Sequence, residues 1–390
     1  MTPIRLSSVA TIVAACATML VPPLAQAQTY KVLYSFQGKP DGGAPYAGVI
    51  QDAKGSLFGT TKEGGVNYGT VFALSKTGTE TRYSFSNGAF PLAGVIQDAN
   101  ENLYGTTEGG GSNGQGTVFE LTKTGTETLL HSFCYGSTCS DGANPVAGLI
   151  RDKKGNLYGT TEYGGTYGKG TVFEVSKTGT ETVLYSFCSQ PSCTDGEYPI
   201  AGLIRDVQGN LYGTTEDGGS SGHGTVFKLS KAGNETVLYS FQGEPDGGLP
   251  YGGVTRDING NFYGATESGG AYNHGTVFEL SKTGTEVVLY SFCSQSTCPD
   301  GWAPYAGVIR DAKGNLYGTT IQGGKYGQGT VFKVTSAGTE TALYSFCSQS
   351  GCPDGASPGA GLFRDKKGNL YGTTTAGGTH SWGVVFMLTP

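Results

Sequence analysis

The sequence predicts an all-β fold, a seven-bladed β-propeller of four-stranded blades in which the N-terminal strand completes the last blade. Three observations predict it. A tripeptide ending in Ser-Phe recurs every 48 to 54 residues, and each unit between repeats contains four short apolar runs. Glycine makes up 67 of 390 residues without a Gly-X-Y period, against a usual share of about 7%, so the glycines serve turns. The tripeptide ends at Phe36, Phe85, Phe133, Phe187, Phe241, Phe292 and Phe346.

One unit illustrates the four strands. The runs are Ala147–Asp152, Asn156–Thr161, Gly170–Val175 and Thr180–Phe187. Each is rich in β-branched and aromatic residues, is bounded by Gly, Asp, Asn or Ser, and shows no helical period. A repeat of about 50 residues with four short strands is typical of a propeller blade.

The two ends of the repeat array indicate a closed ring. The array begins with a fourth strand alone, Tyr30–Phe36, and ends with a third strand, Val384–Leu388. The first strand can therefore complete the last blade and remove an exposed sheet edge. An open solenoid of the same units is the alternative, and it would need terminal units with polar outer faces.

The repeated phrase also resembles known families. The segment Gly148–Thr161, with close copies in every unit, resembles the NHL and related propeller repeats. The full unit, with Glu162–Gly165 and Gly170–Phe173, is similar to the bacterial tandem repeat called GloVer. This resemblance implies a bacterial repeat protein with a propeller-like fold, and it carries no activity to any residue.

Residues 1–27 are predicted to be a signal peptide. Arg5 precedes an apolar run, and Ala25-Gln26-Ala27 forms a small-residue cleavage site. The alternatives are a membrane anchor and a lipoprotein cleavage box ending at Cys16. We expect a secreted or periplasmic protein, cleaved near Ala27, with residues 28–390 as a single domain of seven repeats and no membrane span in the mature chain.

Eight of the nine cysteines form pairs with four residues between the members, and in an exported chain such pairs indicate local disulfides. A zinc site or a redox site is the alternative. The predicted pairs are Cys134/Cys139, Cys188/Cys193, Cys293/Cys298 and Cys347/Cys352.

The longer loops are expected to share one face of the ring and to carry any ligand site. Carboxylates beside flat aromatic rings suit sugar binding, although Asp-Gly also starts turns and aromatic residues also cover blade seams. The candidates are Asp41, Asp141, Asp195, Asp246, Asp300, Asp354, Glu108, Glu162, Glu216, Glu267, Trp302 and Trp382.

Five arginines precede the Asp of the Asp-x-x-Gly-Asn hairpins that join the first and second strands, with glutamine in the two other units. We interpret them as partners of carboxylates between blades rather than as an anion site. They are Arg151, Arg205, Arg256, Arg310 and Arg364.

Composition and motifs limit the functions. A net charge of −6 with no basic run argues against nucleic acid as a partner. The sequence predicts no cofactor, metal or catalytic residue, because it has no nucleophile elbow, phosphate loop or HExxH motif. We expect a monomeric binding module whose partner is a carbohydrate or cell-surface protein. The alternatives are a propeller enzyme, such as a polysaccharide lyase, hydrolase or lactonase, and a purely structural envelope protein.

Overall fold

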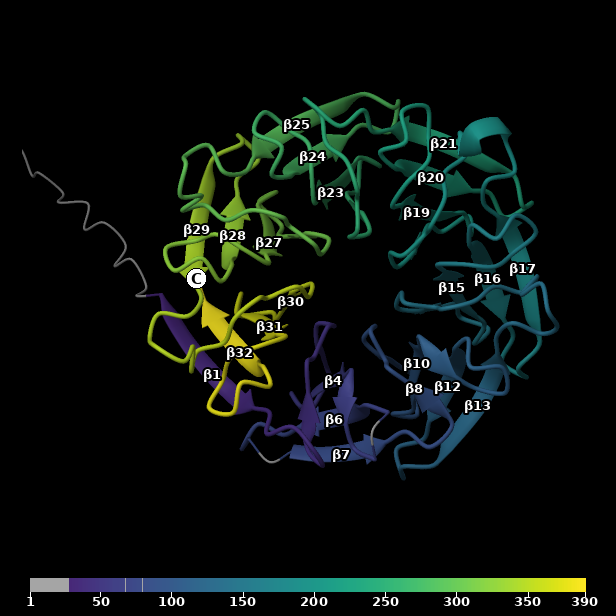
Figure 1. The fold of residues 1–390 in the computed structure, drawn as a ribbon, viewed down its shortest axis with the longest axis horizontal. Helices are drawn as coiled ribbons and strands as arrows, with labels where there is room; N and C mark the ends of the chain where they lie inside the picture. Colours follow the sequence, from purple (N-terminus) through teal and green to yellow (C-terminus); the bar gives the residue numbers. More distant parts are fainter. Residues whose placement is uncertain (1–27, 67, 79) are drawn as a thin grey trace, which may run out of the picture.

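The chain forms a ring of seven four-stranded sheets around one axis (Figure 1). The computed structural model describes residues 28–66, 68–78 and 80–390. The predicted signal peptide lies outside these residues. Within the described part, no helix is long and apolar enough to cross a membrane.

Each blade is antiparallel, and in blades 1 to 6 the strands follow chain order from the axis outward. Blade 1 has β3 (Ile50–Gln51), β4 (Leu57–Thr61), β6 (Thr70–Leu74) and β7 (Glu80–Ser84). Blade 2 has β9 (Ile96–Gln97), β10 (Leu103–Thr107), β12 (Thr117–Leu121) and β13 (Glu127–Ser132). Blade 3 has β14 (Ile150–Arg151), β15 (Leu157–Thr161), β16 (Thr171–Val175) and β17 (Glu181–Ser186). Blade 4 has β18 (Ile204–Arg205), β19 (Leu211–Thr215), β20 (Thr225–Leu229) and β21 (Glu235–Ser240).

The remaining blades repeat this order, with extra short elements in the loops. Blade 5 has β22 (Thr255–Arg256), β23 (Phe262–Thr266), β24 (Thr276–Leu280) and β25 (Glu286–Ser291). Blade 6 has β26 (Ile309–Arg310), β27 (Leu316–Thr320), β28 (Thr330–Val334) and β29 (Glu340–Ser345). Blade 7 has β30 (Phe363–Arg364), β31 (Leu370–Thr374), β32 (Val384–Thr389) and β1 (Thr29–Ser35). The loops add β2 (Gly42–Gly43) paired with β5 (Glu63–Gly64), β8 (Gly88–Ala89) paired with β11 (Gly109–Gly110), and a 3₁₀ turn at Pro191–Cys193.

The ring closes through strands from opposite ends of the array, as the sequence predicts. Strand β1 pairs antiparallel with β32, from Thr29 opposite Thr389 to Ser35 opposite Val384. In Figure 1 the purple β1 lies beside the yellow β32. The last blade therefore has the same four strands as the others.

Phenylalanine pairs hold neighbouring blades together. The second and third strands are buried almost throughout, because each sheet lies between two others. Seven edge-to-face contacts, at 4.9 to 5.3 Å between ring centroids, join a Phe after each outer strand to a Phe in the third strand of the next blade. Phe36, which follows the closing strand β1, contacts Phe72 of blade 1. The last blade therefore packs on the first blade through the same contact that joins the other neighbouring blades.

Glycines allow the innermost strands to meet near the axis. A Cβ on Gly307 would lie 2.6 Å from the carbonyl oxygen of Gly253 in the preceding blade, and one on Gly253 would lie 2.7 Å from that of Gly202. Real Cβ atoms do not approach backbone oxygens so closely, so a side chain there would push the blades apart. This agrees with the small residues that the sequence places at the start of each first strand.

The four predicted disulfides are confirmed. Each joins cysteines five positions apart in a loop that follows an outer strand: Cys134–Cys139, Cys188–Cys193, Cys293–Cys298 and Cys347–Cys352. They point to an oxidising environment, extracellular or periplasmic.

Candidate functional site

The two faces of the ring carry different connections. On one, which we call the turn face, tight turns join the first strand to the second and the third to the fourth. They close through backbone bonds such as Asp152 N–H to Asn156 O, 2.9 Å, and Ser176 N–H to Thr180 O, 2.8 Å. The other, the loop face, holds the longer connections, and it contains the predicted ligand residues.

A repeated backbone device shapes the loop face. In every blade the residue before a proline has a left-handed φ, between 49° and 58°. Left-handed φ in a residue with a side chain is costly, of order 1–3 kcal/mol, and is found mostly where the structure fixes a site. The seven residues are Ala44, Phe90, Asn144, Tyr198, Leu249, Ala303 and Ser357.

Each strained residue positions the residue that follows the second strand. The carbonyl of Asn144 accepts the N–H of Glu162 at 3.0 Å, and that of Tyr198 accepts the N–H of Glu216 at 2.9 Å. Phe90 and Leu249 hold the backbones of Glu108 and Glu267 in the same way. Four consecutive blades, 2 to 5, therefore present a glutamate at equivalent places.

Three tyrosines complete this group, which we call the axial patch. They precede the glycine-containing start of the first strands of blades 1, 5 and 6. The charges of Glu162, Glu216 and Glu267 all act on Tyr305, as does the hydroxyl of Tyr46, so these groups lie near one another. The axial patch comprises Glu108, Glu162, Glu216, Glu267, Tyr46, Tyr251 and Tyr305.

A stacked tyrosine pair is the best-defined part of the axial patch. The rings of Tyr251 and Tyr305 are stacked, with centroids 4.4 Å apart and planes 19° from parallel. The hydroxyl of Tyr251 donates to Oε1 of Glu216 across the blade boundary, 2.7 Å. Tyr305 remains 38% exposed, so one ring stays available for contact.

The patch is uneven around the ring. Blades 6 and 7 have Ile321 and Thr375 where blades 2 to 5 have glutamate, and blade 1 has Lys62, whose Nζ lies 5.3 Å from the centroid of the Tyr46 ring. The acidic half of the patch consists of the four glutamates, and its aromatic half consists of the three tyrosines. The two halves meet at Tyr251, which contacts both Glu216 and Tyr305. A ligand would contact both halves only by lying across this boundary.

Burial changes the acidity of the patch. It raises the pKa of Glu162, with a contribution from the charge of Glu108. It also raises the pKa of Glu216, to which Asp217, Glu162 and Glu267 contribute, and that of Glu267. For Tyr305, burial and the neighbouring glutamates raise the pKa to about 12. The patch thus contains carboxyl groups that hold protons more strongly than free ones.

The six predicted loop aspartates lie elsewhere, in the base of the loops. Asp195 is only 2% exposed; its Oδ2 accepts the Tyr185 hydroxyl at 2.7 Å and the Ser189 N–H at 2.8 Å. Equivalent bonds join Tyr34 to Asp41, Tyr239 to Asp246, Tyr290 to Asp300 and Tyr344 to Asp354, and His131 bonds to Asp141. These carboxylates fasten each loop to the outer strand, so they face protein groups rather than solvent.

A glutamate from the next blade faces four of these aspartates. Burial, with the charge of the aspartate, raises the pKa of Glu181, Glu235 and Glu286 to about 7 and that of Glu340 to about 8. Among the described residues, Oε1 of each of these glutamates is buried without a hydrogen-bond partner. Asp300, which faces Glu340, likewise has a buried Oδ1 without one.

The two tryptophans lie away from the axial patch. Trp302 is half-buried beside the His274 ring, 5.2 Å between centroids. Trp382, 37% exposed, covers Gly38 and Gly43 at the ring closure. Of the predicted ligand residues, the structure therefore groups only the four glutamates.

The five arginines contact aromatic rings more than carboxylates. Each places its guanidinium over the second-strand tyrosine of the preceding blade, 5.1 to 5.8 Å from the ring centroid. Arg151 also lies 3.9 Å from Oδ2 of Asp98. The arginines do act between blades, but the expected carboxylate partner is mainly a tyrosine ring.

Among the described residues, one group brings together three possible metal ligands: His274, Cys293 and Cys298. The two sulfurs are joined in a disulfide, so they cannot act as thiolate ligands.

Sequence reasoning missed the three axial tyrosines. Their signal was present, because Tyr46, Tyr251 and Tyr305 each follow the proline that precedes the small first-strand residues. Those small residues indicate strands that lie next to the axis. The residue immediately before them is therefore also expected near the axis.

Comparison with known proteins gives the fold and the family. The streptogramin B lyase structure is 14% identical, with a TM-score of 0.62 over 93% of this chain and 97% of the other. Virginiamycin B lyase from Staphylococcus aureus is 12% identical, with a TM-score of 0.60 over 93% and 100%. At such identities the likeness concerns the fold alone, and no curated protein matches the chain.

The family is given by a sequence model described as the Gloeobacter/Verrucomicrobia repeat. It matches three overlapping stretches, residues 23–227, 135–300 and 202–390. Together these stretches contain all seven blades. This chain therefore belongs to the Gloeobacter/Verrucomicrobia repeat family.

Proposed function

We propose that this protein is an exported binding module whose axial patch takes a hydroxyl-rich ligand, a glycan or another surface polymer. The observation that carries the proposal is the Tyr251–Tyr305 stack with Glu216 held at its edge. A sugar ring offers an apolar face to an aromatic ring and hydroxyl donors to carboxylates. The predicted signal peptide and the four disulfides are consistent with work outside the cytoplasm.

The uneven patch defines how such a ligand would lie. A sugar stacked on the exposed face of Tyr305 would have the acidic half, Glu162 to Glu267, on one side. Ile321 and Gly359 on blades 6 and 7 leave the other side uncharged, so a polymer could continue there. This geometry favours an internal segment of a chain over a free acid, which the glutamates would repel.

Glycan arrays followed by isothermal titration would test this proposal. Tyr305→Ala should weaken binding at least tenfold, because it removes the stacking face. Tyr326→Ala is the matched control: that tyrosine is 41% exposed, much like Tyr305, but belongs to a loop that the patch does not include. The proposal should be dropped if no glycan binds, or if both variants and Trp302→Ala weaken binding equally. A partner protein captured without any glycan binding would also count against it.

Catalysis is the second candidate, favoured by the raised pKa of Glu162 and Glu216. A carboxyl group whose pKa is raised by burial holds a proton more strongly than a free one, which suits a general acid toward a bound polymer. Mass spectrometry of an array-selected oligosaccharide after incubation would detect cleavage. An enzyme should lose turnover and keep binding in Glu162→Gln, whereas a binding module should leave the oligosaccharide intact.

A further inference from the structure

The seam between blades 1 and 2 departs from the repeat at three places. Where five other seams have an arginine over a tyrosine, this seam has Gln97 and Phe58. Phe58 pairs in register with Ala73, whereas Tyr104 and Tyr158 in the next blades pair with glutamates. All three changes remove atoms from the same space on the turn face.

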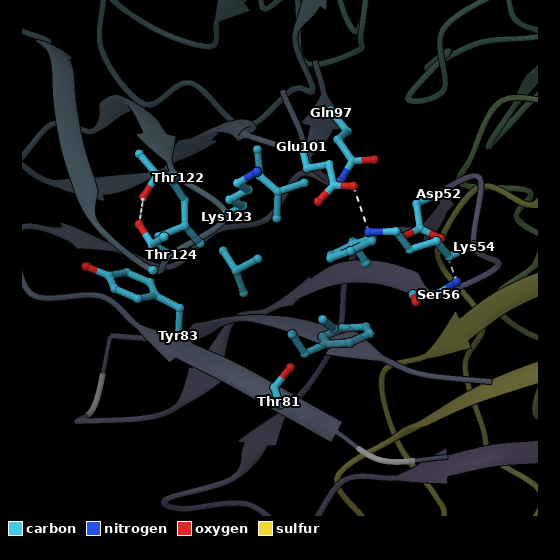
Figure 2. A pocket seen from close by; sticks show the side chains of 17 residues that line it. Asp52, Lys54, Ser56, Thr81, Tyr83, Gln97, Glu101, Thr122, Lys123 and Thr124 are labelled. Atoms are coloured by element: carbon cyan, nitrogen blue, oxygen red, sulfur yellow. Dashed lines mark hydrogen bonds and ion pairs between the residues drawn. The ribbon is translucent and has the colours of Figure 1, made fainter. Parts of the chain in front are cut away.

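The result is a groove between the two blades (Figure 2). Its volume is about 410 Å³. The grooves beside the second-strand tyrosine at the arginine-containing seams 3/4 and 6/7 are about 270 and 240 Å³, and a separate groove between the first strands of blades 3 and 4 is about 660 Å³. The apolar walls include Phe58, Leu103 and Leu121. A space of this size and lining accommodates a small organic molecule.

The groove also has an acidic group at a hairpin position where the other seams have none. Glu101 occupies the hairpin position that is glycine in six of the seven blades, and it keeps a left-handed φ of 68°. In blade 4 a Cβ at that position would lie 2.9 Å from the guanidinium of Arg205. Glu101 therefore places a carboxylate beside the space that a guanidinium fills in the other seams, at the energetic cost of a strained backbone.

The groove has one positive charge fewer than a filled seam. The charged lining at seam 3/4 is Asp152, Glu174, Lys154, Lys231 and Arg205, whereas here it is Asp52, Glu101, Lys54 and Lys123, and the arginine is missing. Lys54 and Glu101 form an ion pair, 2.7 Å, drawn as a dashed line in Figure 2, and their charges cancel. Their side chains are 70% and 46% exposed, so the pair contributes little stability and opens easily.

We propose that this groove binds a small molecule bearing a planar amidinium or guanidinium group, seated over the ring of Phe58 with Asp52 and Glu101 at its edge. A planar cation on an aromatic face is the same contact that the five arginines make within the ring. The site lies on the turn face, so it is separate from the axial patch.

The seam between blades 7 and 1 provides an internal comparison. It also has glutamine, Gln51, in place of arginine, and its groove is about 400 Å³. Its lining contains Lys31 and Lys76 and no acidic residue. Size alone would make the two grooves equal ligand sites. Only the groove of blades 1 and 2 has carboxylates that could face a cation, and there Lys54 and Lys123 balance them.

The test is isothermal titration of the purified protein with benzamidine, and with benzamide as the neutral molecule of the same shape. We expect saturable benzamidine binding, in about the millimolar range for one cation–aromatic contact, and at least fivefold weaker binding of benzamide. Gln97→Arg should reduce benzamidine affinity at least tenfold by restoring the internal guanidinium, and Gln51→Arg should change it less than twofold. Ala73→Met, the residue type that blade 7 has there, should reduce affinity about fivefold without altering charge.

Thermal melting separates these effects from misfolding, because Gln97→Arg restores the common repeat residue and should melt at or above the wild-type temperature. Absence of saturable benzamidine binding would overturn the proposal. So would equal affinity for benzamide, or binding that Gln97→Arg leaves unchanged.

Discussion

Replacing Glu340 with glutamine should make the protein more stable at alkaline pH and leave it nearly unchanged at acidic pH. Burial and Asp300 raise the pKa of Glu340 from the ordinary 4.5 to about 8. A carboxyl whose pKa is raised by folding favours the folded state while it is protonated. That contribution is complete below pH 4.5 and is lost as the pH rises through about 8.

The size of the stability change follows from the difference between the two pKa values of Glu340. At about 1.4 kcal/mol for each pH unit between the two values, the full contribution would be about 5 kcal/mol. The side chain is only half-buried, and solvent screens its charge, so we expect about 2 kcal/mol. Glutamine stays uncharged beside Asp300 at every pH, so Glu340→Gln should exceed the wild type by about 2 kcal/mol at pH 8.5 and match it near pH 5.

Urea unfolding at pH 5 and pH 8.5, with the disulfides intact, measures this difference. Glu127→Gln is the control, because the loop facing Glu127 has no aspartate. There Oε2 accepts the hydroxyls of Tyr83 at 2.8 Å and Ser86 at 3.2 Å, so its replacement should cost about 1 kcal/mol. The reasoning is refuted if Glu340→Gln follows the wild-type pH dependence, or if Glu127→Gln shows the same alkaline gain.

Three further predictions concern the ring. Gly307→Ala should lower the free energy of unfolding by about 2 kcal/mol, because its Cβ would meet the backbone of the preceding blade. Gly361→Ala has open space around it and should cost less than about 0.5 kcal/mol. Chemical denaturation compares the two variants, and equal costs would contradict the close packing of the first strands near the axis. Changing Cys188 and Cys193 together to serine should cost about 2 kcal/mol by the entropy of a short closed loop, and denaturation with and without reductant checks that reduction no longer affects this loop. Phe36→Ala should cost about 4 kcal/mol because it empties the contact at ring closure; a loss below about 1 kcal/mol in urea unfolding would show that closure contributes little.

The sequence predicts the blades well because each strand is a local pattern. Leu157–Thr161 and its copies carry the apolar spacing and bounding turns that define a strand, and fifty-residue repetition identifies the blade. Ring closure follows from the same pattern, since only the last blade lacks its own fourth strand.

The candidate site was less predictable, because its residues meet through the arrangement of blades. Asp195 and Glu162 are both acidic residues in connections of the loop face, yet one is fastened to Tyr185 beneath its loop and the other lies in the axial patch near Glu108. The local sequence does not distinguish a carboxylate that is bonded beneath a loop from one that faces the axial patch. Only the position of neighbouring strands decides between them.

Ring closure also has a consequence for how the chain acquires its structure. The outer strand of the last blade, β1, is made first, and its partner β32 is made more than three hundred residues later. Contacts so distant in sequence form slowly, because the intervening chain must be ordered before they contribute. Until then blade 7 has an unpaired edge, a species prone to association. We therefore expect closure to be a late event in folding, and the time before it to be when the protein most needs protection from aggregation.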